Sequence, residues 1–397
     1  MQKNFVKIVL KSGKDQAVKR FHPWVFSGAI KKIYGTPAEG DLVEVYSNHD
    51  ELLGIGHYQP SSISVRIVSF KKEEIAYPFW KEKIAAAWEL RKMLGFANNS
   101  QTNTFRLVHA EGDGLPGLII DFYNGTAVMQ MHSAGMYLIK DELVKALKEV
   151  LGDRLKAVYD KSARTLPFKT PVQREDGFLM GEGSPEEIVN ENGLLFKVNW
   201  EKGQKTGFFI DQRENRQLVQ NYAANRNVLN MFCYTGGFSV YALKGGAKLV
   251  DSVDSSAQAT DLTNENVALN FGTQANHRTF TADAMQFLKD TGGNYDCIIL
   301  DPPAFSKHRN TLPQALTGYK RINTRAFEQI NKGGVLFTFS CSQVVSKDKF
   351  REAVFTAAAI AGRNVRILHQ LSQPADHPVN IFHPESEYLK GLVLYVE

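Results

Sequence analysis

The sequence predicts an α/β protein with a doubly wound domain at its carboxyl end, preceded by a small β-barrel and a small α+β domain. From about residue 185 onward, short apolar runs alternate with helix-like stretches, which is typical of a mostly parallel sheet covered by helices on both faces. The first 72 residues instead read as short strands separated by turn residues. We therefore predict three domains, with bounds 1–72, 73–184 and 185–397.

Length and composition agree with several globular domains. The 397 residues are too many for one compact core, and the chain is 43% hydrophobic with a net charge of +5. No run approaches the twenty or so apolar residues that a membrane-spanning helix needs, and the first residues lack the core of a signal peptide. We therefore expect a cytoplasmic protein that does not contact a membrane.

The amino-terminal region combines predicted strands with clustered positive charge. Up to Lys32 there are eight Lys or Arg residues and one acid, Asp15. Basic residues among aromatic ones are typical of a surface that grips a phosphate backbone, although a solvated basic face explains them equally simply. The segment from Arg20 to Ile30 resembles the opening of a PUA domain, a small RNA-binding barrel. The residues that we expect to contact RNA here are Lys19, Arg20, His22 and Trp24. The strands expected in this region are 5–10, 41–46, 52–59 and 63–70.

The middle region reads as a helix followed by strands, a second helix and a further strand. The expected helices cover about 77–94 and 138–151, and the expected strands cover 105–109, 117–122, 127–131 and 157–159. His109, Glu111 and Asp113 are of metal-ligating types, but the Gly and Pro residues around them favour a tight hairpin. The three cysteines are too scattered for a metal knuckle or a disulfide framework. We therefore predict no metal site.

A nucleoside site is indicated by a strand, a glycine turn and a helix start over residues 227–239. An acid, Asp254, closes the next strand, where a carboxylate can take the ribose hydroxyls. The turn lacks the Gly-x-Gly-x-x-Gly of pyrophosphate binders, which argues against NAD and FAD. S-adenosylmethionine has an adenosine but no phosphates, and it is the cofactor we expect. The predicted contacts are Phe232, Tyr234, Thr235, Gly236, Asp254, Ser255, Asp283, Ala284, Asp301 and Pro302, with Gln212 and Arg213 upstream at the methionine carboxylate.

A thiol and a carboxylate are expected to meet at the same sheet edge. Asp301-Pro302-Pro303-Ala304-Phe305 and Phe339-Ser340-Cys341-Ser342 each follow an apolar run that reads as a buried parallel strand. Residues just past the carboxyl ends of such strands border the ligand crevice. We therefore predict Cys341 and Asp301 as catalytic residues acting on an electron-poor ring. Cys233 and Cys297 are expected to be packing residues.

With these motifs in view, the whole chain resembles the RlmI-like family of 23S ribosomal RNA cytosine-C5 methyltransferases. The residues that carry the resemblance are 206–213, 232–237, 301–305, 340–342, 376–378 and 385–391. The resemblance implies a Rossmann-like class I methyltransferase domain behind a PUA-like barrel. It also implies methyl transfer from S-adenosylmethionine to a cytosine of 23S ribosomal RNA or the large-subunit particle, with Cys341 as nucleophile. Many RNA cytosine-C5 methyltransferases have a second cysteine where this chain has Pro303, so the release of product stays open.

The implied chemistry needs a thiolate and an acid. A thiolate that adds to C6 of cytosine makes C5 nucleophilic, but an unperturbed thiol with a pKa of ~8.5 is mostly protonated near neutrality. Lys307, His308 or basic residues facing the RNA could favour the thiolate, and Asp301 is placed to act as an acid at N3. Lys307 and Tyr319 are expected on the side of the RNA, although Tyr319 fits a helix surface equally well. The base that removes the C5 proton is not identified.

Three other functions compete with this interpretation. Asp-Pro-Pro-Ala-Phe resembles the motif with which amino-group methyltransferases hold an exocyclic NH₂, and such enzymes need no cysteine. An RNA-binding assembly factor without catalysis, or a methyltransferase of small molecules, are the other two alternatives. The sequence also leaves open the modified nucleotide and whether the protein is a homodimer.

Overall fold

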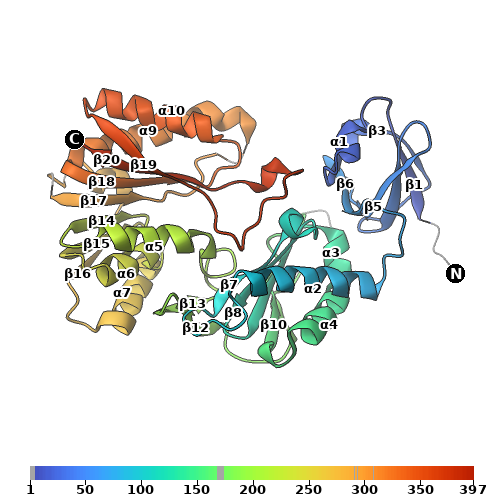
Figure 1. The fold of residues 1–397 in the computed structure, drawn as a ribbon, viewed down its shortest axis with the longest axis horizontal. Helices are drawn as coiled ribbons and strands as arrows, with labels where there is room; N and C mark the ends of the chain where they lie inside the picture. Colours follow the sequence, from blue (N-terminus) through green and yellow to red (C-terminus); the bar gives the residue numbers. More distant parts are fainter. Residues whose placement is uncertain (1–4, 168–173, 290, 293, 307) are drawn as a thin grey trace. The chain divides into compact units, whose positions relative to one another are not determined.

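The computed structural model describes residues 5–167, 174–289, 291–292, 294–306 and 308–397 (Figure 1). The chain forms two compact units, each assembled from separate stretches of sequence. The first unit comprises residues 1–187, 198–208 and 375–386, and the second comprises 188–197, 209–374 and 387–397. No helix among the described residues is both long and apolar enough to cross a membrane.

The amino-terminal part of the first unit is a six-stranded sheet with the order β2-β6-β5-β4-β1-β3. Neighbouring strands are antiparallel except for β1 and β4, which are parallel. Alternate apolar residues of these strands converge on one core that includes Ile8, Val43 and Val65. The strands are β1 (Val6–Leu10), β2 (Trp24–Phe26), β3 (Ile30–Tyr34), β4 (Leu42–Tyr46), β5 (Leu52–Tyr58) and β6 (Ile63–Ser69).

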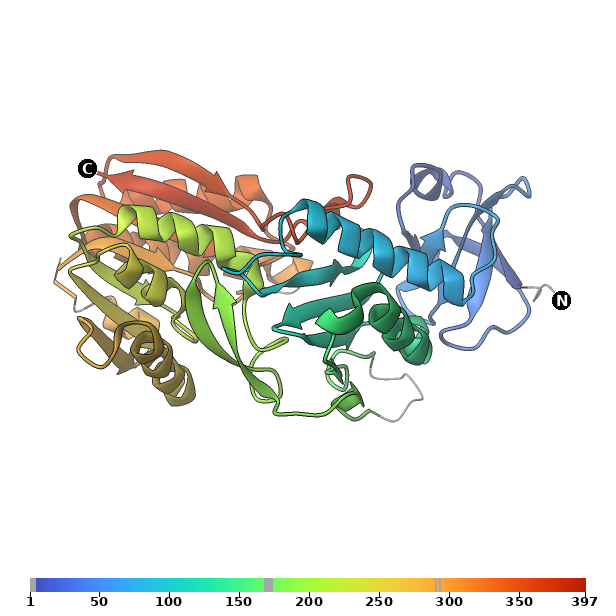
Figure 2. The ribbon, with the colours of Figure 1, turned by 60° about the horizontal axis from the view of Figure 1, so that its bottom comes forward.

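The rest of the first unit is built on a five-stranded sheet with the order β11-β10-β9-β8-β7. Helices α2 and α4 pack against each other and share an apolar core with this sheet (Figures 1 and 2). The core includes Trp80 of α2, Leu147 of α4 and Leu107 of β7. The elements are α2 (Tyr77–Met93), β7 (Thr104–His109), β8 (Leu118–Tyr123), β9 (Thr126–Met131), α4 (Lys140–Leu151), β10 (Ala157–Asp160) and β11 (Gly177–Met180).

The second unit contains a seven-stranded sheet with the order β16-β15-β14-β17-β18-β20-β19. The first five strands in this order are parallel, and β20 is antiparallel to both β18 and β19. The chain order reverses at β14, whose neighbours are β15 on one side and β17 on the other. The strands are β14 (Asn227–Met231), β15 (Leu249–Asp254), β16 (His277–Thr281), β17 (Tyr295–Leu300), β18 (Ile330–Ser340), β19 (Val365–Leu371) and β20 (Lys390–Val396).

Helices cover both faces of this sheet, as expected for a doubly wound fold (Figure 1). One core joins the sheet to α5 and α6, and α7 packs beside α6. A second core joins the opposite face to α8, α9 and α10. The helices are α5 (Arg213–Tyr222), α6 (Gly237–Lys244), α7 (Ala257–Phe271), α8 (Ala284–Phe287), α9 (Leu312–Gln329) and α10 (Lys347–Ile360).

The predicted fold class is confirmed, and most predicted strands match observed ones to within one or two residues. The short strands β2 and β3 were missed because the polar and aromatic residues around them show no alternation. A two-residue turn at Asn192-Gly193 joins β12 (Glu186–Glu191) to β13 (Leu194–Asn199) in a separate two-stranded sheet. The domain bounds at residues 72 and 184 stay a prediction.

Candidate active site

The reversal of strand order at β14 and β17 identifies where a ligand crevice is expected in the second unit. In open α/β sheets, ligands bind beyond the carboxyl ends of the strands at this point of the order. The predicted glycine turn follows β14, Asp254 ends β15, Asp301 follows β17, and Cys341 follows β18. Every one of these positions is therefore at the same edge of the sheet.

The turn after β14 has an unusual backbone that only some residues tolerate. Phe232 and Tyr234 have φ values of 59° and 47°, and Gly236 has a φ of 76°. A Cβ on Gly236 would lie 2.6 Å from Cγ2 of Thr263, so glycine is needed here for both backbone conformation and space. The buried Thr235 is fixed through its carbonyl oxygen, which accepts a hydrogen bond from Asn266 Nδ2 at 2.8 Å.

Asp254 fixes the glycine turn and the start of the next loop. Its Oδ2 accepts from the backbone N–H of Tyr234 and its Oδ1 accepts from that of Ser256, each at 3.0 Å. Each carboxylate oxygen has a second lone pair, so Asp254 can also accept hydrogen bonds from two ribose hydroxyls. The neighbouring Ser255 is exposed. These contacts fit the nucleoside role that the sequence predicts for Asp254.

Asp283 and Ala284 follow the third strand of this half of the sheet, as predicted. The N–H of Ala282 donates to the backbone oxygen of Asp254 at 2.9 Å, which places the ends of β15 and β16 together. Asp283 caps α8 by accepting from the N–H of Gln286 at 2.9 Å. Its side chain is exposed, whereas Ala284 is buried. The structure therefore places both residues beside the acid that ends β15.

Asp301 is the most strongly perturbed carboxyl group at this edge. Burial and the charge of Asp211 together raise its pKa to about 7, while a hydrogen bond from Gln212 opposes the shift. Gln212 is itself buried, and its Oε1 accepts from Asn215 Nδ2 at 2.6 Å. Asp301 is thus poised to hold or give a proton near neutral pH.

A buried ion pair that no local pattern of residues indicates joins α5 to the end of β12. Arg216 donates to both carboxylate oxygens of Glu191 at 2.9 and 2.7 Å, and to the carbonyl oxygen of Phe209 at 2.8 Å. Both charged side chains are almost fully buried. Arg213, predicted at the methionine carboxylate, is also buried at the start of α5, one residue after Gln212.

Strand pairing brings Cys341 and Asp301 to neighbouring positions. Leu300 of β17 pairs with Thr338 of β18. The segments that follow these two strands therefore leave the sheet side by side. Of the three cysteines, Cys341 alone is partly exposed. Burial raises the pKa values of Cys233 and Cys297 to about 12, in keeping with their predicted packing role.

Tyr319 of α9 contacts residues of both segments that carry the predicted catalytic residues. Burial raises the pKa of its hydroxyl to about 12, and negative charge on Cys341 and Asp301 acts in the same direction. Its oxygen accepts a hydrogen bond from Ser340 Oγ at 2.9 Å, and its ring packs against Phe305 with centroids 4.7 Å apart. Tyr319 was expected on the side of the RNA, but its side chain has no exposed surface. It is therefore a buried packing residue between the two segments.

Three hydrogen bonds that the sequence motifs did not indicate hold the loop after β18. Ser342 Oγ donates to the carbonyl oxygen of Ser306 at 2.6 Å, which ties this loop to the segment after Asp301. The ammonium group of Lys390, at the start of β20, donates to the carbonyl oxygens of Ser342 and Val345 at 2.5 and 2.7 Å. Burial lowers the pKa of Lys390 to about 8, while negative charge on Cys341 opposes that shift.

The predicted RNA-contacting residues lie in different settings. Arg20 is exposed, and Lys19 pairs with Asp15 and Glu51 at 3.1 and 2.8 Å. His22 and Trp24 are partly buried, and the indole N–H of Trp24 donates to Glu111 at 2.9 Å. Lys307 lies outside the described residues. Direct contact of these residues with RNA stays a prediction.

The fold and the site define a class I methyltransferase, and comparison with known proteins agrees. Residues 143–384 match the family model of S-adenosylmethionine-dependent methyltransferases, and residues 8–70 match that of the PUA-like domain. The chain is 39% identical over 395 residues to a protein of Alteromonas mediterranea named ribosomal RNA large subunit methyltransferase I, with 98% of each chain covered. The chain therefore belongs to this family of S-adenosylmethionine-dependent methyltransferases.

Solved structures show the same architecture. A protein of Streptococcus mutans described as a SAM-dependent methyltransferase has a TM-score of 0.84 and 25% identity, and the match covers 98% of this chain and 100% of that one. A second structure with the same score, identity and coverage is of a methyltransferase complexed with SAH. S-adenosylmethionine is accordingly the methyl donor of this chain.

Proposed function

We propose that this protein methylates C5 of a cytosine in large-subunit (23S) ribosomal RNA through a transient covalent bond to Cys341. One observation carries the proposal: a partly exposed thiol and a carboxyl group with a pKa near 7 follow neighbouring strands at the ligand edge of the sheet. The names of the curated relatives support ribosomal RNA as the substrate, and the PUA-like match supports RNA binding by the amino-terminal sheet.

In the proposed reaction, the Cys341 thiolate forms a bond to C6 of the cytosine. The electron pair of the C5–C6 double bond moves toward N3, where Asp301 in its protonated form donates a hydrogen bond or the proton itself. C5 is then nucleophilic and bonds to the methyl carbon, whose bond to the sulfonium of the donor would break to leave S-adenosylhomocysteine. Loss of the C5 proton to a base restores the double bond and expels the thiolate, so the enzyme is returned unchanged. The pKa of Asp301, about 7, suits both the donation and the return of this proton.

Bound S-adenosylmethionine supplies the methyl group at the sheet edge. Gly236 lets the backbone approach a ligand, and Asp254 can accept from the ribose hydroxyls. Ser255, Asp283 and Ala284 border the same strand ends. We further propose Phe232, Tyr234, Thr235, Pro302, Gln212 and Arg213 as cofactor contacts.

Lys390 is proposed to favour the reactive form of Cys341. Its ammonium group is buried at the carbonyl oxygens of the Cys341 loop, and its interaction with a negative charge on Cys341 is favourable. Electrostatic stabilisation is mutual, so the same ammonium stabilises a thiolate at Cys341 relative to the thiol. Lys390 thereby supplies the positive environment that the chemistry needs.

Two expectations about the protein in the cell complete the proposal. An enzyme of ribosomal RNA acts where ribosomal subunits are made, so we propose the cytoplasm as its location. A homodimer is a further expectation, which sedimentation of the purified protein tests directly.

Mass spectrometry of the product tests the proposed function. The protein is incubated with labelled S-adenosylmethionine and large-subunit ribosomal RNA lacking the modification, and the RNA is digested to nucleosides. We expect 5-methylcytidine at a single position. N4-methylcytidine or a methylated purine would instead support the amino-group reaction, and a protein that binds the cofactor without methylating RNA would count against both.

A further inference from the structure

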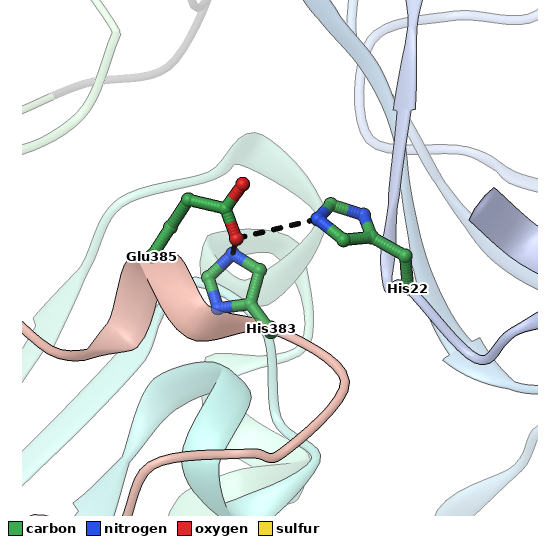
Figure 3. Close-up of side chains that lie close together, drawn as sticks. All are labelled: His22, His383 and Glu385. Carbon is green, nitrogen blue, oxygen red and sulfur yellow. Dashed lines mark hydrogen bonds and ion pairs between the residues drawn. The ribbon is translucent and has the colours of Figure 1, made fainter.

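Three side chains of metal-ligating types converge in the first unit although they are far apart in sequence. His22 precedes β2, and His383 and Glu385 belong to the segment that returns to this unit near the end of the chain (Figure 3). One ligand atom from each residue lies within 4.8 Å of the others. Among the described residues, this is the one group of at least three His, Cys, Asp or Glu side chains with such geometry.

The carboxylate of Glu385 lies at separations from the two imidazoles that are near those in a tetrahedral metal site. Oε2 of Glu385 lies 3.4 Å from Nε2 of His22 and 3.8 Å from Nε2 of His383. Zinc bonds to nitrogen and carboxylate oxygen at about 2.0–2.2 Å, and tetrahedral angles then place neighbouring ligand atoms roughly 3.3–3.5 Å apart. All three ligand atoms lie within 4.8 Å of one another, so side-chain rotations that close the wider separations would bring them to one ion.

The ring of His383 provides independent support for a ligand. Its side chain is 2% exposed, and its Nε2 has no hydrogen-bond partner among the described residues. A buried polar atom without a partner is costly, and a metal ion would satisfy it. The other nitrogen, Nδ1, lies 2.6 Å from Ser386 Oγ, which can accept its proton and leave the Nε2 lone pair for a metal. The indole of Trp24 packs against the same ring at 4.3 Å between centroids.

His22 is oriented in a comparable way. Its Nδ1 lies 3.4 Å from the carbonyl oxygen of Trp24 and 3.2 Å from the N–H of Trp24. A metal at Nε2 requires the proton on Nδ1, which would then donate a hydrogen bond to that carbonyl in place of accepting one from the Trp24 N–H. The other charges that act on His383 are carboxylates, Glu111 and Glu385, and both favour a cation.

We propose that His22, His383 and Glu385 bind one divalent transition-metal ion of the zinc class. Two imidazoles and one carboxylate suit such an ion, and three protein ligands leave the fourth position for water. The ion would link the segment before β2 to residues 383–386, and so fix the position of Trp24 as well. This site is separate from the methyl-transfer residues, and its test is independent of the proposed reaction.

Zinc titration of the full-length protein, freed of metal with a chelator, tests this site. We expect one zinc ion per chain by calorimetry. His22→Gln and Glu385→Gln should each weaken binding at least tenfold, because each removes one of three ligands. His49→Gln is the matched control, since it removes an exposed histidine outside the cluster and should bind zinc as the parent does.

Thermal unfolding of the parent and the variants, with and without zinc, tests the site even if a variant is less stable than the parent. Glu385 is an exposed residue, so Glu385→Gln should fold normally without zinc. Zinc should raise the unfolding temperature of the parent and of His49→Gln, but not that of Glu385→Gln. A parent protein that binds no zinc, or equal affinities of all four proteins, would overturn the proposal.

Discussion

Lys390 donates to the carbonyl oxygen of Ser342 from a buried position at the start of β20, directly beside the loop that carries Cys341. A buried ammonium is costly, and burial lowers its pKa to about 8. Its two carbonyl contacts and the favourable interaction with charge on Cys341 offset part of that cost. Lys390 therefore links the antiparallel strand β20 to the loop that carries Cys341.

Replacing Lys390 by Met should reduce methylation by about tenfold or more. If the pKa of the Cys341 thiol rises by one unit, the fraction of reactive thiolate falls about tenfold at pH values below the pKa. The acid side of the pH profile of kcat/KM should also shift to higher pH, which lost packing alone would not cause. Lys390→Arg should restore part of the profile.

Lys349→Met is the control for this prediction. Lys349 is exposed and pairs with Glu352 on α10, so its replacement should leave both rate and pH profile unchanged. An unshifted profile for Lys390→Met would contradict the electrostatic role of Lys390.

Asp301→Asn should lose activity but gain stability at high pH. Because the folded-state pKa of Asp301 is raised to about 7 from 3.8, the folded protein holds a proton that the unfolded chain releases between these values. Asp301 therefore destabilises the fold progressively as the pH rises from about 4 to 7, by at most about 4 kcal/mol. The neutral amide removes this penalty and also the repulsion from Asp211.

Urea unfolding of parent and variant at pH 5 and pH 8 measures the effect. The stability gain of Asp301→Asn should be larger at pH 8, while methylation falls by about 10²–10⁴-fold for loss of the acid. A gain that is equal at both pH values would mean that Asp301 titrates normally.

Glu191→Gln should destabilise the second unit by about 3–5 kcal/mol. The substitution leaves the Arg216 guanidinium buried without its counter-ion, and breaking such a pair by removing one partner is strongly destabilising. Arg325→Ala breaks a more exposed pair with Glu328 and should change stability by less than about 1 kcal/mol. Similar losses in both variants, measured by urea unfolding, would argue against the importance of burial.

Gly236→Ala should weaken binding of S-adenosylhomocysteine at least tenfold by calorimetry. The new Cβ would meet Thr263 at 2.6 Å in a left-handed backbone, so the turn between β14 and α6 must move. Gly246→Ala is a close control, because its φ of 80° is similar and its Cβ would meet nothing within 4 Å. Both variants should lose roughly 1–2 kcal/mol of stability from the backbone alone. Equal affinities for S-adenosylhomocysteine would show that the turn tolerates a side chain.

The site residues that could be predicted from sequence are those that directly follow, or end, the parallel strands of the sheet. Asp254, Asp301 and Cys341 each follow an apolar run, and parallel strands of one sheet bring such positions to one edge. The burial of Tyr319 could not be predicted, because an 18-residue helix leaves open which of its sides faces the core. The apolar residues Ile322 and Phe327 on the same helix were the one sequence feature that indicated which side of the helix is buried.

Contacts between residues far apart in sequence could not be predicted from sequence motifs. Lys390 lies in the segment 385–391 that carries the family resemblance, but no role was predicted for its side chain. Its contacts with Ser342 and Val345 depend on the antiparallel pairing of β20 with β18. His22 and His383 are separated by most of the chain, so no spacing rule indicates that they meet. Such contacts follow from tertiary packing and not from local pattern.

The central claim, a covalent bond between Cys341 and the target base, is tested most directly with RNA that contains 5-fluorocytosine. Fluorine at C5 cannot leave as a proton does, so the covalent intermediate should accumulate after methyl transfer. We expect a protein–RNA adduct on denaturing gels for the parent and for Cys297→Ala, with the RNA mapped to Cys341 by mass spectrometry, and neither adduct nor methylation for Cys341→Ala. Full methylation by Cys341→Ala would contradict the account.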